Sequence, residues 1–282
     1  RLPDNHTHRL IDCLTHSRFS FALYRLPWTD ECYFILQTSE DVKTLDDIAE
    51  LNGKHGFVIA PFQQTEEHPI VLIRPDVTAY DWPEITQSIT SVKYADAILT
   101  CKPLSTAPIA TLNEEERYER YFAAFNRFIK PLKAQDFKKL VLSRPAFCPI
   151  NEEFSPLETF VKACNAYPRM MIYLCHTPVS GTWLGSTPEI LLSGHAMNWK
   201  TVALAGTMPI ENEVEPTEWS PKNQEEQSIV AEYVRKIVKK HGRKMMEKGP
   251  YTARAGQLVH LKTDFLFQLK ETGYLGDLLK EL

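Results

Sequence analysis

The sequence predicts an α+β protein with two antiparallel β-sheets packed together and helices outside. Short aromatic and β-branched runs recur in groups along the chain, separated by turn residues. Amphipathic helical segments interrupt these groups without alternating regularly with single strands. The sequence also contains no phosphate-binding glycine loop and no repeat of fixed period. With 282 residues, 43% of them hydrophobic, the chain is long enough to bury a large core.

Composition excludes several classes of protein. The net charge of −4 argues against a basic surface for nucleic acid or anionic lipid. No apolar run approaches the ~18 residues of a membrane span, and no signal peptide opens the chain. The six cysteines are scattered without a Cys-x-x-Cys pair. We therefore expect reduced thiols in the core of a cytoplasmic protein, without a nucleic-acid or membrane partner.

Residues 1–110 are predicted to form a half made mostly of strands. Its apolar runs lie at residues 19–24, 32–36, 56–60 and 70–73. No motif in this half indicates chemistry. A Pro-containing connector at residues 103–108 separates it from residues 111–282, although the two parts are expected to form one integrated domain.

Helix-start signals mark the second half. Asn113 and Glu116 form a predicted capping box, followed by an aromatic stripe that includes Tyr118, Phe122 and Phe125. The sequence predicts that this stripe packs in the core and that the helix ends near residue 130. Ser155 and Glu158 form a second predicted capping box. A long helix is predicted over residues 225–241.

Glu189 is the first candidate for chemistry. It follows Pro188, and the apolar run 190–192 after it is predicted to be a buried strand. A carboxylate at the mouth of such a strand loses part of its hydration, which raises its pKa towards that of a proton donor. The alternative is a structural glutamate at a strand end, hydrogen-bonded to a turn.

A lysine and two further acids can also be explained either by a role in chemistry or by a purely structural role. Lys139 precedes the run 140–142, which is predicted to be a buried strand, and a lysine extending into solvent at a strand end would explain it equally well. Glu225 and Glu226 are predicted to lie in the first turn of the long helix. Acids there are favoured by the helix dipole and need no other role.

Five blocks together resemble the chorismate-utilising enzymes, and most closely the isochorismate synthases of menaquinone and siderophore biosynthesis. They occur in the family's order between residues 139 and 261. The blocks are Lys139-Leu-Val-Leu-Ser-Arg144, Gly185-Ser-Thr-Pro-Glu-Ile-Leu191, Ala203-Leu-Ala-Gly-Thr207, Lys222-Asn-Gln-Glu-Glu226 and Gln257-Leu-Val-His-Leu261.

The resemblance implies an isomerase that moves the ring hydroxyl of chorismate from C4 to C2. By similarity, Lys139 is the base that activates water and Glu189 is the general acid. Glu226 matches a carboxylate that binds Mg²⁺, the family's cofactor. The residues that match the substrate-binding positions are Ala205, Gly206, Thr207 and His260.

Departures from the family pattern leave alternatives open. Gln227 stands where the family usually has His, and Asn223 and Gln224 replace the common Asp and Arg. Family members continue beyond the matching blocks, so the resemblance implies that a C-terminal part is missing and that these residues alone are inactive. Ala205 argues against aminodeoxychorismate synthase, and Lys139 against anthranilate synthase. Salicylate synthase, or a truncated member without turnover, remains possible. The sequence defines neither pathway nor oligomeric state.

Overall fold

The computed structural model describes residues 3–91, 98, 113–151, 153–210, 214–216, 218–271 and 273–282. The chain divides into two compact units, one containing Arg1–Lys102 with Ser155–Leu282 and the other Pro103–Phe154. The connector predicted at 103–108 lies outside the described residues. The division predicted at residue 110 stays a prediction.

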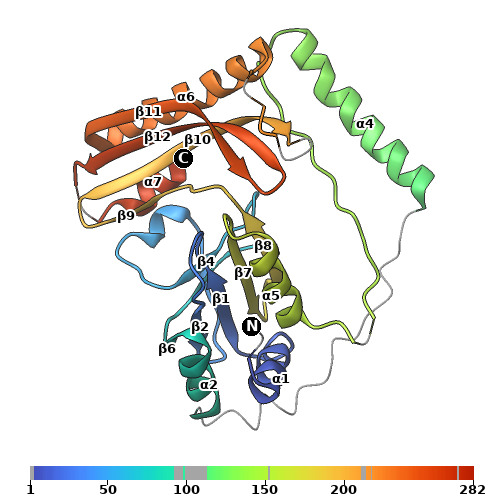
Figure 1. Ribbon diagram of the computed structural model, residues 1–282, viewed down its shortest axis with the longest axis vertical. Helices are drawn as coiled ribbons and strands as arrows, with labels where there is room; N and C mark the ends of the chain where they lie inside the picture. Colours follow the sequence, from blue (N-terminus) through green and yellow to red (C-terminus); the bar gives the residue numbers. More distant parts are fainter. Residues whose placement is uncertain are drawn as a thin grey trace. The chain divides into compact units, whose positions relative to one another are not determined.

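A five-stranded antiparallel sheet forms the first layer of the larger unit (Figure 1). Its strands follow the order β6-β2-β1-β7-β8. Helices α1 (Asn5–Leu14), α2 (Asp81–Ser91) and α5 (Pro156–Ala166) share a buried apolar cluster with one face of the sheet. The strands are β1 (Ser20–Arg25), β2 (Tyr33–Gln37), β6 (Val77–Tyr80), β7 (Met171–Thr177) and β8 (Gly181–Thr187).

The other face of this sheet packs on a small three-stranded sheet. Ala22 and Cys175 of the large sheet share a cluster with Ile73 of the small one. The small sheet contains β3 (Lys43–Leu45), β4 (Phe57–Ile59) and β5 (Ile70–Ile73), and the short helix η1 (Ile48–Leu51) lies between its first two strands in sequence.

A four-stranded antiparallel sheet carries most of the residues considered below. Its order is β11-β12-β10-β9, from β9 (Ser193–His195), β10 (Asn198–Pro209), β11 (Gly242–Ala255) and β12 (Leu258–Leu269). Helix α6 (Pro221–His241) covers one face (Figure 1). Residues of α6, β10 and β12 share a buried cluster that includes Phe265 and Val238.

The last helix ties this sheet to the N-terminal part of the chain. Helix α7 (Leu275–Glu281) receives a hydrogen bond from Asn52, which follows η1, through Nδ2 to Asp277 Oδ2 at 2.7 Å. In return, Gly276 N donates to Asn52 Oδ1 at 2.7 Å. Lys280 and Asp47 form an ion pair at the same contact. These bonds explain why the first hundred residues and the last stretch belong to one unit.

The smaller unit contains one long described helix, α4 (Glu114–Lys133). Its predicted capping box is confirmed, because Glu116 N donates to Asn113 Oδ1 at 2.8 Å and Asn113 N donates to Glu116 Oε2 at 3.0 Å. The helix continues through Pro131, beyond its predicted end. The prediction that its aromatic stripe is buried was wrong: α4 has no buried residue, and Tyr118 is 67% exposed.

The α+β class, with antiparallel sheets and helices outside, is confirmed. Two predicted strands are not. Residues 140–142 and 190–192 adopt neither strand nor helix, and Val141 and Leu191 are exposed. A short apolar run indicates a strand only when a neighbouring strand pairs with it, and the described residues supply no such partner for either run.

The cysteines and the membrane prediction can be compared with the structure only in part. Cys32 and Cys175 are buried, and burial raises the pKa of each thiol to about 12. Cys148 is exposed, which contradicts the expectation of a core thiol, and Cys101 lies outside the described residues. In the part of the chain that the structure describes, no helix is both long and apolar enough to cross a bilayer.

Adjacent positions on β12 test how the four-stranded sheet is stabilised. Phe265 is fully buried under α6, whereas Leu266 points to the opposite face and is 41% exposed. Phe265→Ala should lower the free energy of unfolding by about 3–5 kcal/mol, because it leaves a cavity in the core. Leu266→Ala is the matched control and should cost much less. Urea unfolding measures both; equal losses would contradict this description of the core.

Candidate functional site

An irregularity in β10 brings the predicted substrate-binding residues together. The register between β10 and β12 shifts between Ala205 and Thr207. Gly206 has φ +74°, and a Cβ there would lie 3.2 Å from the carbonyl oxygen of Asn223 in α6. A side chain would therefore meet both backbone strain and the helix. Glycine lets α6 approach the strand at this point.

His260 lies directly across from Thr207. The two residues are register partners, and Thr207 Oγ1 lies 3.0 Å from His260 Nδ1. Both side chains are on the face of the sheet away from α6, because their neighbours on β12, Leu261 and Thr263, face the helix side. The structure thus gathers Ala205, Gly206, Thr207 and His260 at one place on two paired strands.

Glu226 is carried by α6, which packs on β10. The helix begins at Pro221, with the Ser220 hydroxyl accepting from Asn223 N at 3.2 Å. It therefore starts four residues before its predicted start at Glu225. The two acids lie in its second turn, where the helix dipole gives them less stabilisation. The dipole explanation for Glu226 is weakened by this position.

Gln227, the neighbour of Glu226, connects the three elements. Its side chain is only 2% exposed. Its Nε2 donates to the carbonyl oxygen of Ala203 in β10 and to Thr263 Oγ1 in β12, each at 3.0 Å. A carbonyl can only accept, so the first bond also fixes which way the amide points. One buried side chain thereby links the helix of Glu226 to the strands of Thr207 and His260.

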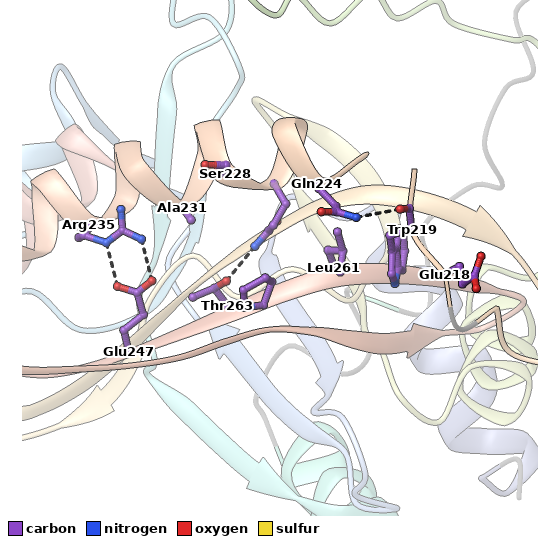
Figure 2. Close-up of a pocket in the computed structure, with 11 residues that line it drawn as sticks. Glu218, Trp219, Gln224, Ser228, Ala231, Arg235, Glu247, Leu261 and Thr263 are labelled. Atoms are coloured by element: carbon purple, nitrogen blue, oxygen red, sulfur yellow. Dashed lines mark hydrogen bonds and ion pairs between the residues drawn. The ribbon is translucent and has the colours of Figure 1, made fainter. Parts of the chain in front are cut away.

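A cavity of about 650 Å³ lies beside this amide, between α6 and the β11–β12 hairpin (Figure 2). At one end Arg235 forms two hydrogen bonds to Glu247, at 2.7 and 2.8 Å. At the other end Gln224 Nε2 donates to the backbone oxygen of Trp219 at 2.8 Å. Gln227 Oε1 is buried and has no hydrogen-bond partner among the described residues. The cavity therefore offers an unused acceptor.

Glu189 lies two residues beyond the end of β8, in the connection to β9. Its backbone N–H donates to Thr187 Oγ1 at 3.0 Å. The carboxylate is accessible to solvent, yet burial raises its pKa, and the nearby charge of Lys262 only partly opposes this. The predicted direction of the shift is confirmed. The predicted cause of the shift was a buried strand directly after Glu189. This cause is not confirmed, because residues 190–192 are irregular.

Lys139 belongs to the smaller unit, on an exposed segment without regular structure. The sequence predicted that Lys139 begins a strand, and this prediction was wrong. Its place relative to Glu189 stays a prediction.

Comparison with known proteins gives the family. The family model described as chorismate binding enzyme matches residues 43–282. The chain belongs to the chorismate binding enzyme family. A comparison with curated protein sequences returned no match. The matched range includes the whole of the smaller unit, most of the larger unit and all of the predicted site residues.

Solved structures show the fold of this chorismate binding enzyme in other proteins. One is DhbC from Bacillus anthracis, a candidate 2,3-dihydroxybenzoate-specific isochorismate synthase, with 16% identity and a TM-score of 0.64 over 97% of this chain and 74% of that one. Another is MenF, the menaquinone-specific isochorismate synthase from Escherichia coli. It has 12% identity and a TM-score of 0.59 over 100% of this chain and 71% of that one.

Two features of the site were missed from the sequence. Gln227 was noted only as a departure from the family's usual His, and its buried amide was not foreseen. Lys262 and Asp264 were not singled out, although they alternate with apolar residues after His260. That alternation is the signal that could have placed all three side chains on one face of a strand.

Removing the Gln227 amide should loosen the attachment of α6 to the sheet. Gln227→Leu leaves the Ala203 carbonyl and the Thr263 hydroxyl without their buried donor, so the free energy of unfolding should fall by about 1–3 kcal/mol. Gln224→Leu, at the exposed rim of the same cavity, is the matched control. Chemical denaturation measures both. A loss no greater at 227 than at 224 would contradict the described role.

The raised pKa of Glu189 predicts a pH-dependent stability. The folded protein holds this proton more tightly than the unfolded chain, so the favourable contribution is present at acid pH and lost as pH rises through the folded-state pKa. Glu189→Gln is neutral throughout. The variant should match the wild type in acid and become the more stable of the two towards neutral pH.

Urea unfolding midpoints measured from about pH 4 to pH 8 check this difference. Glu225→Gln, on the exposed side of α6, controls for the loss of one surface charge. Parallel pH profiles for wild type and Glu189→Gln would show that Glu189 has an ordinary pKa.

Proposed function

We propose that this chorismate binding enzyme is an isochorismate synthase that depends on Mg²⁺. The observation that carries the proposal is the pairing of Thr207 with His260 at the irregular point of β10, next to the helix that carries Glu226. Glu189, whose pKa burial raises, lies on a segment close enough to β12 for Lys262 to act on its charge. A carboxylic acid that keeps its proton closer to neutral pH suits a reaction that must protonate a departing hydroxyl. Membership of the family and the fold of two isochorismate synthases support the same reaction.

The proposed reaction replaces one C–O bond by another. A water oxygen bonds to C2 of chorismate while Lys139, in its neutral form, takes the proton that this water loses. The two ring double bonds each shift by one position, which frees C2 for the new bond and forms a double bond at C4. The bond between C4 and its hydroxyl breaks as Glu189 gives its proton to the departing oxygen, which leaves as water. One water enters and one leaves, so the net change is an isomerisation. The acid and the base must therefore act from different sides of the ring.

Thr207 and His260 are proposed to orient the substrate. Their side chains are already hydrogen-bonded to each other, so a hydroxyl or carboxylate of the substrate meets a fixed pair rather than two mobile groups. Gly206 adds a backbone N–H at the irregular point of β10. The side chain of Ala205, the register partner of Leu261, is buried on the α6 side, so Ala205 is proposed to meet the substrate through its backbone.

Glu226 is proposed as a protein ligand for Mg²⁺. Among the described residues no three acids, histidines or cysteines gather into a ready metal site. Mg²⁺ often takes only one or two protein carboxylates and keeps several waters, so one glutamate with a substrate carboxylate suits it better than a softer metal. When bound, the ion would offset the negative charge of that carboxylate.

Incubation with chorismate and Mg²⁺ tests the proposal, with chromatography to detect isochorismate and EDTA to remove the ion. Lys139→Ala or Glu189→Gln should each lower turnover by roughly 10²–10⁴ without loss of fold. Lys138→Ala, the exposed neighbour, is the matched control and should be nearly normal.

Three outcomes would count against parts of the proposal. Near-normal turnover in either catalytic variant would reject the assigned roles. Release of pyruvate would identify a salicylate synthase, and chorismate binding without any product would identify a family member that binds without turnover.

A further inference from the structure

A row of charged side chains continues from His260 along β12. Successive residues of a strand point to opposite faces, so His260, Lys262 and Asp264 share the face away from α6. Tyr251 in β11 is the register partner of Lys262, and Asp264 lies opposite Val202 in β10. Neighbouring side chains in this row are about 7 Å apart. The row therefore begins at the proposed substrate residues and leads away from them.

Asp264 is the fixed negative charge of this row. It is only 8% exposed. The Tyr251 hydroxyl donates to its Oδ2, and its Oδ1 lies 3.3 Å from Lys262 Nζ and 3.7 Å from Lys200 Nζ. Burial acts to raise the pKa of Asp264, but the tyrosine hydrogen bond and the two lysines outweigh it and lower that pKa. The carboxylate is thus ionised at neutral pH.

The charges around Asp264 do not balance. One buried carboxylate meets two ammonium groups, so one positive charge is left over. Lys248, the register partner of Asp264 on β11, is a further cation, although it is exposed. The other titratable neighbours are His260 on the same face, Glu189, whose charge Lys262 affects, and Tyr251, whose pKa burial and Asp264 raise to about 12. Whenever Glu189 holds its proton, this face carries a net positive charge.

Lys262 is held in place more firmly than a surface lysine. Its side chain is 21% exposed, it contacts Asp264, and its Nζ lies 5.9 Å from the centre of the Tyr251 ring. Lys200 is more exposed, at 39%. A partly buried ammonium that shares its ion-pair carboxylate, Asp264, with a second lysine gains from an additional anion.

We propose that Lys262, positioned by Asp264 and Tyr251, binds one of the two carboxylates of the substrate. This proposal rests on the proposed function, because it assumes a small dicarboxylate oriented by Thr207 and His260. Lys262 follows His260 by two residues on the same face, so a molecule held at His260 reaches its ammonium group within about 7 Å. A lysine acts there as a point charge, without the two-pronged geometry of arginine.

The first test measures binding of chorismate by calorimetry, in the full chain. Lys262→Met should weaken binding about 10- to 100-fold, the effect of losing one charge-assisted hydrogen bond. Lys262→Arg keeps the charge and should restore most of the affinity. Lys236→Met removes a lysine from the exposed side of α6, where it pairs with Glu232, and should leave affinity unchanged. Equal affinities for the Lys262→Met and Lys236→Met proteins would overturn the proposal.

A second measurement separates direct contact from a structural role. The monomethyl esters of chorismate each lack one carboxylate charge. For the ester of the carboxylate that Lys262 binds, wild type and Lys262→Met should bind equally well, because the interaction is already gone. If Lys262 had only a structural role, Lys262→Met would weaken the binding of both esters and of chorismate to the same extent, and that result would reject the contact. If Lys262→Met does not fold, Lys262→Met/Asp264→Asn removes both charges and allows the same comparison.

The assay distinguishes this proposal from the proposed function. Turnover with an unchanged KM in Lys262→Met would reject the carboxylate contact and leave the isochorismate synthase proposal standing. Binding that depends on Lys262 without any product would support the contact and reject the reaction. Where both hold, Lys262→Met should raise KM much more than it lowers kcat, since a distant carboxylate is bound similarly in the ground and transition states.

Discussion

The hydrogen bonds of the Gln227 amide are the interaction on which the site depends. They join α6 to β10 through the Ala203 carbonyl and to β12 through the Thr263 hydroxyl. Apolar packing between the helix and the sheet supplies more free energy, but it tolerates small sliding movements. A buried amide between two fixed acceptors does not, because each displaced bond leaves an unpaired polar group away from water. These hydrogen bonds fix how far along its own axis α6 lies against the sheet, and so they fix where Glu226 lies relative to Thr207 and His260.

Gly206 contributes from the strand side. The register shift between Ala205 and Thr207 turns the end of β10 so that Thr207 meets His260. The same backbone carries the positive φ that brings it near Asn223. Helix and strand therefore approach closely where the proposed substrate residues lie. A larger residue at 206 would adopt a strained backbone conformation and press on Asn223 of α6.

The sequence predicted those parts of the fold that local patterns determine. The capping atoms of Asn113 and Ser155 and the strands β1 and β2 follow from short-range preferences, and the structure contains them. It was wrong where an apolar run needs a distant partner to become a strand, as at residues 140–142 and 190–192. Whether such a run is buried depends on pairing, which the run itself does not encode.

The site follows the same division. Residue types and order indicated Glu189, the β10 turn and His260, because the family blocks record the chemistry. They did not indicate Gln227 or Asp264. The role of Gln227 comes from hydrogen bonds to residues 24 or more positions away in the chain, and the role of Asp264 comes from its burial. A glutamine and an aspartate are common surface residues, so nothing in their identity announces a buried bond. Only the three-dimensional contacts reveal them.

The electrostatics around Glu189 join these observations. Burial raises its pKa and Lys262 lowers it, and burial prevails. Lys262 also forms an ion pair with Asp264, whose pKa is lowered. An anionic ligand bound at Lys262 would repel the ionised form of Glu189 and so raise the pKa of Glu189 further. Binding of a dicarboxylate would then favour the protonated glutamic acid, which is the form that the proposed reaction requires.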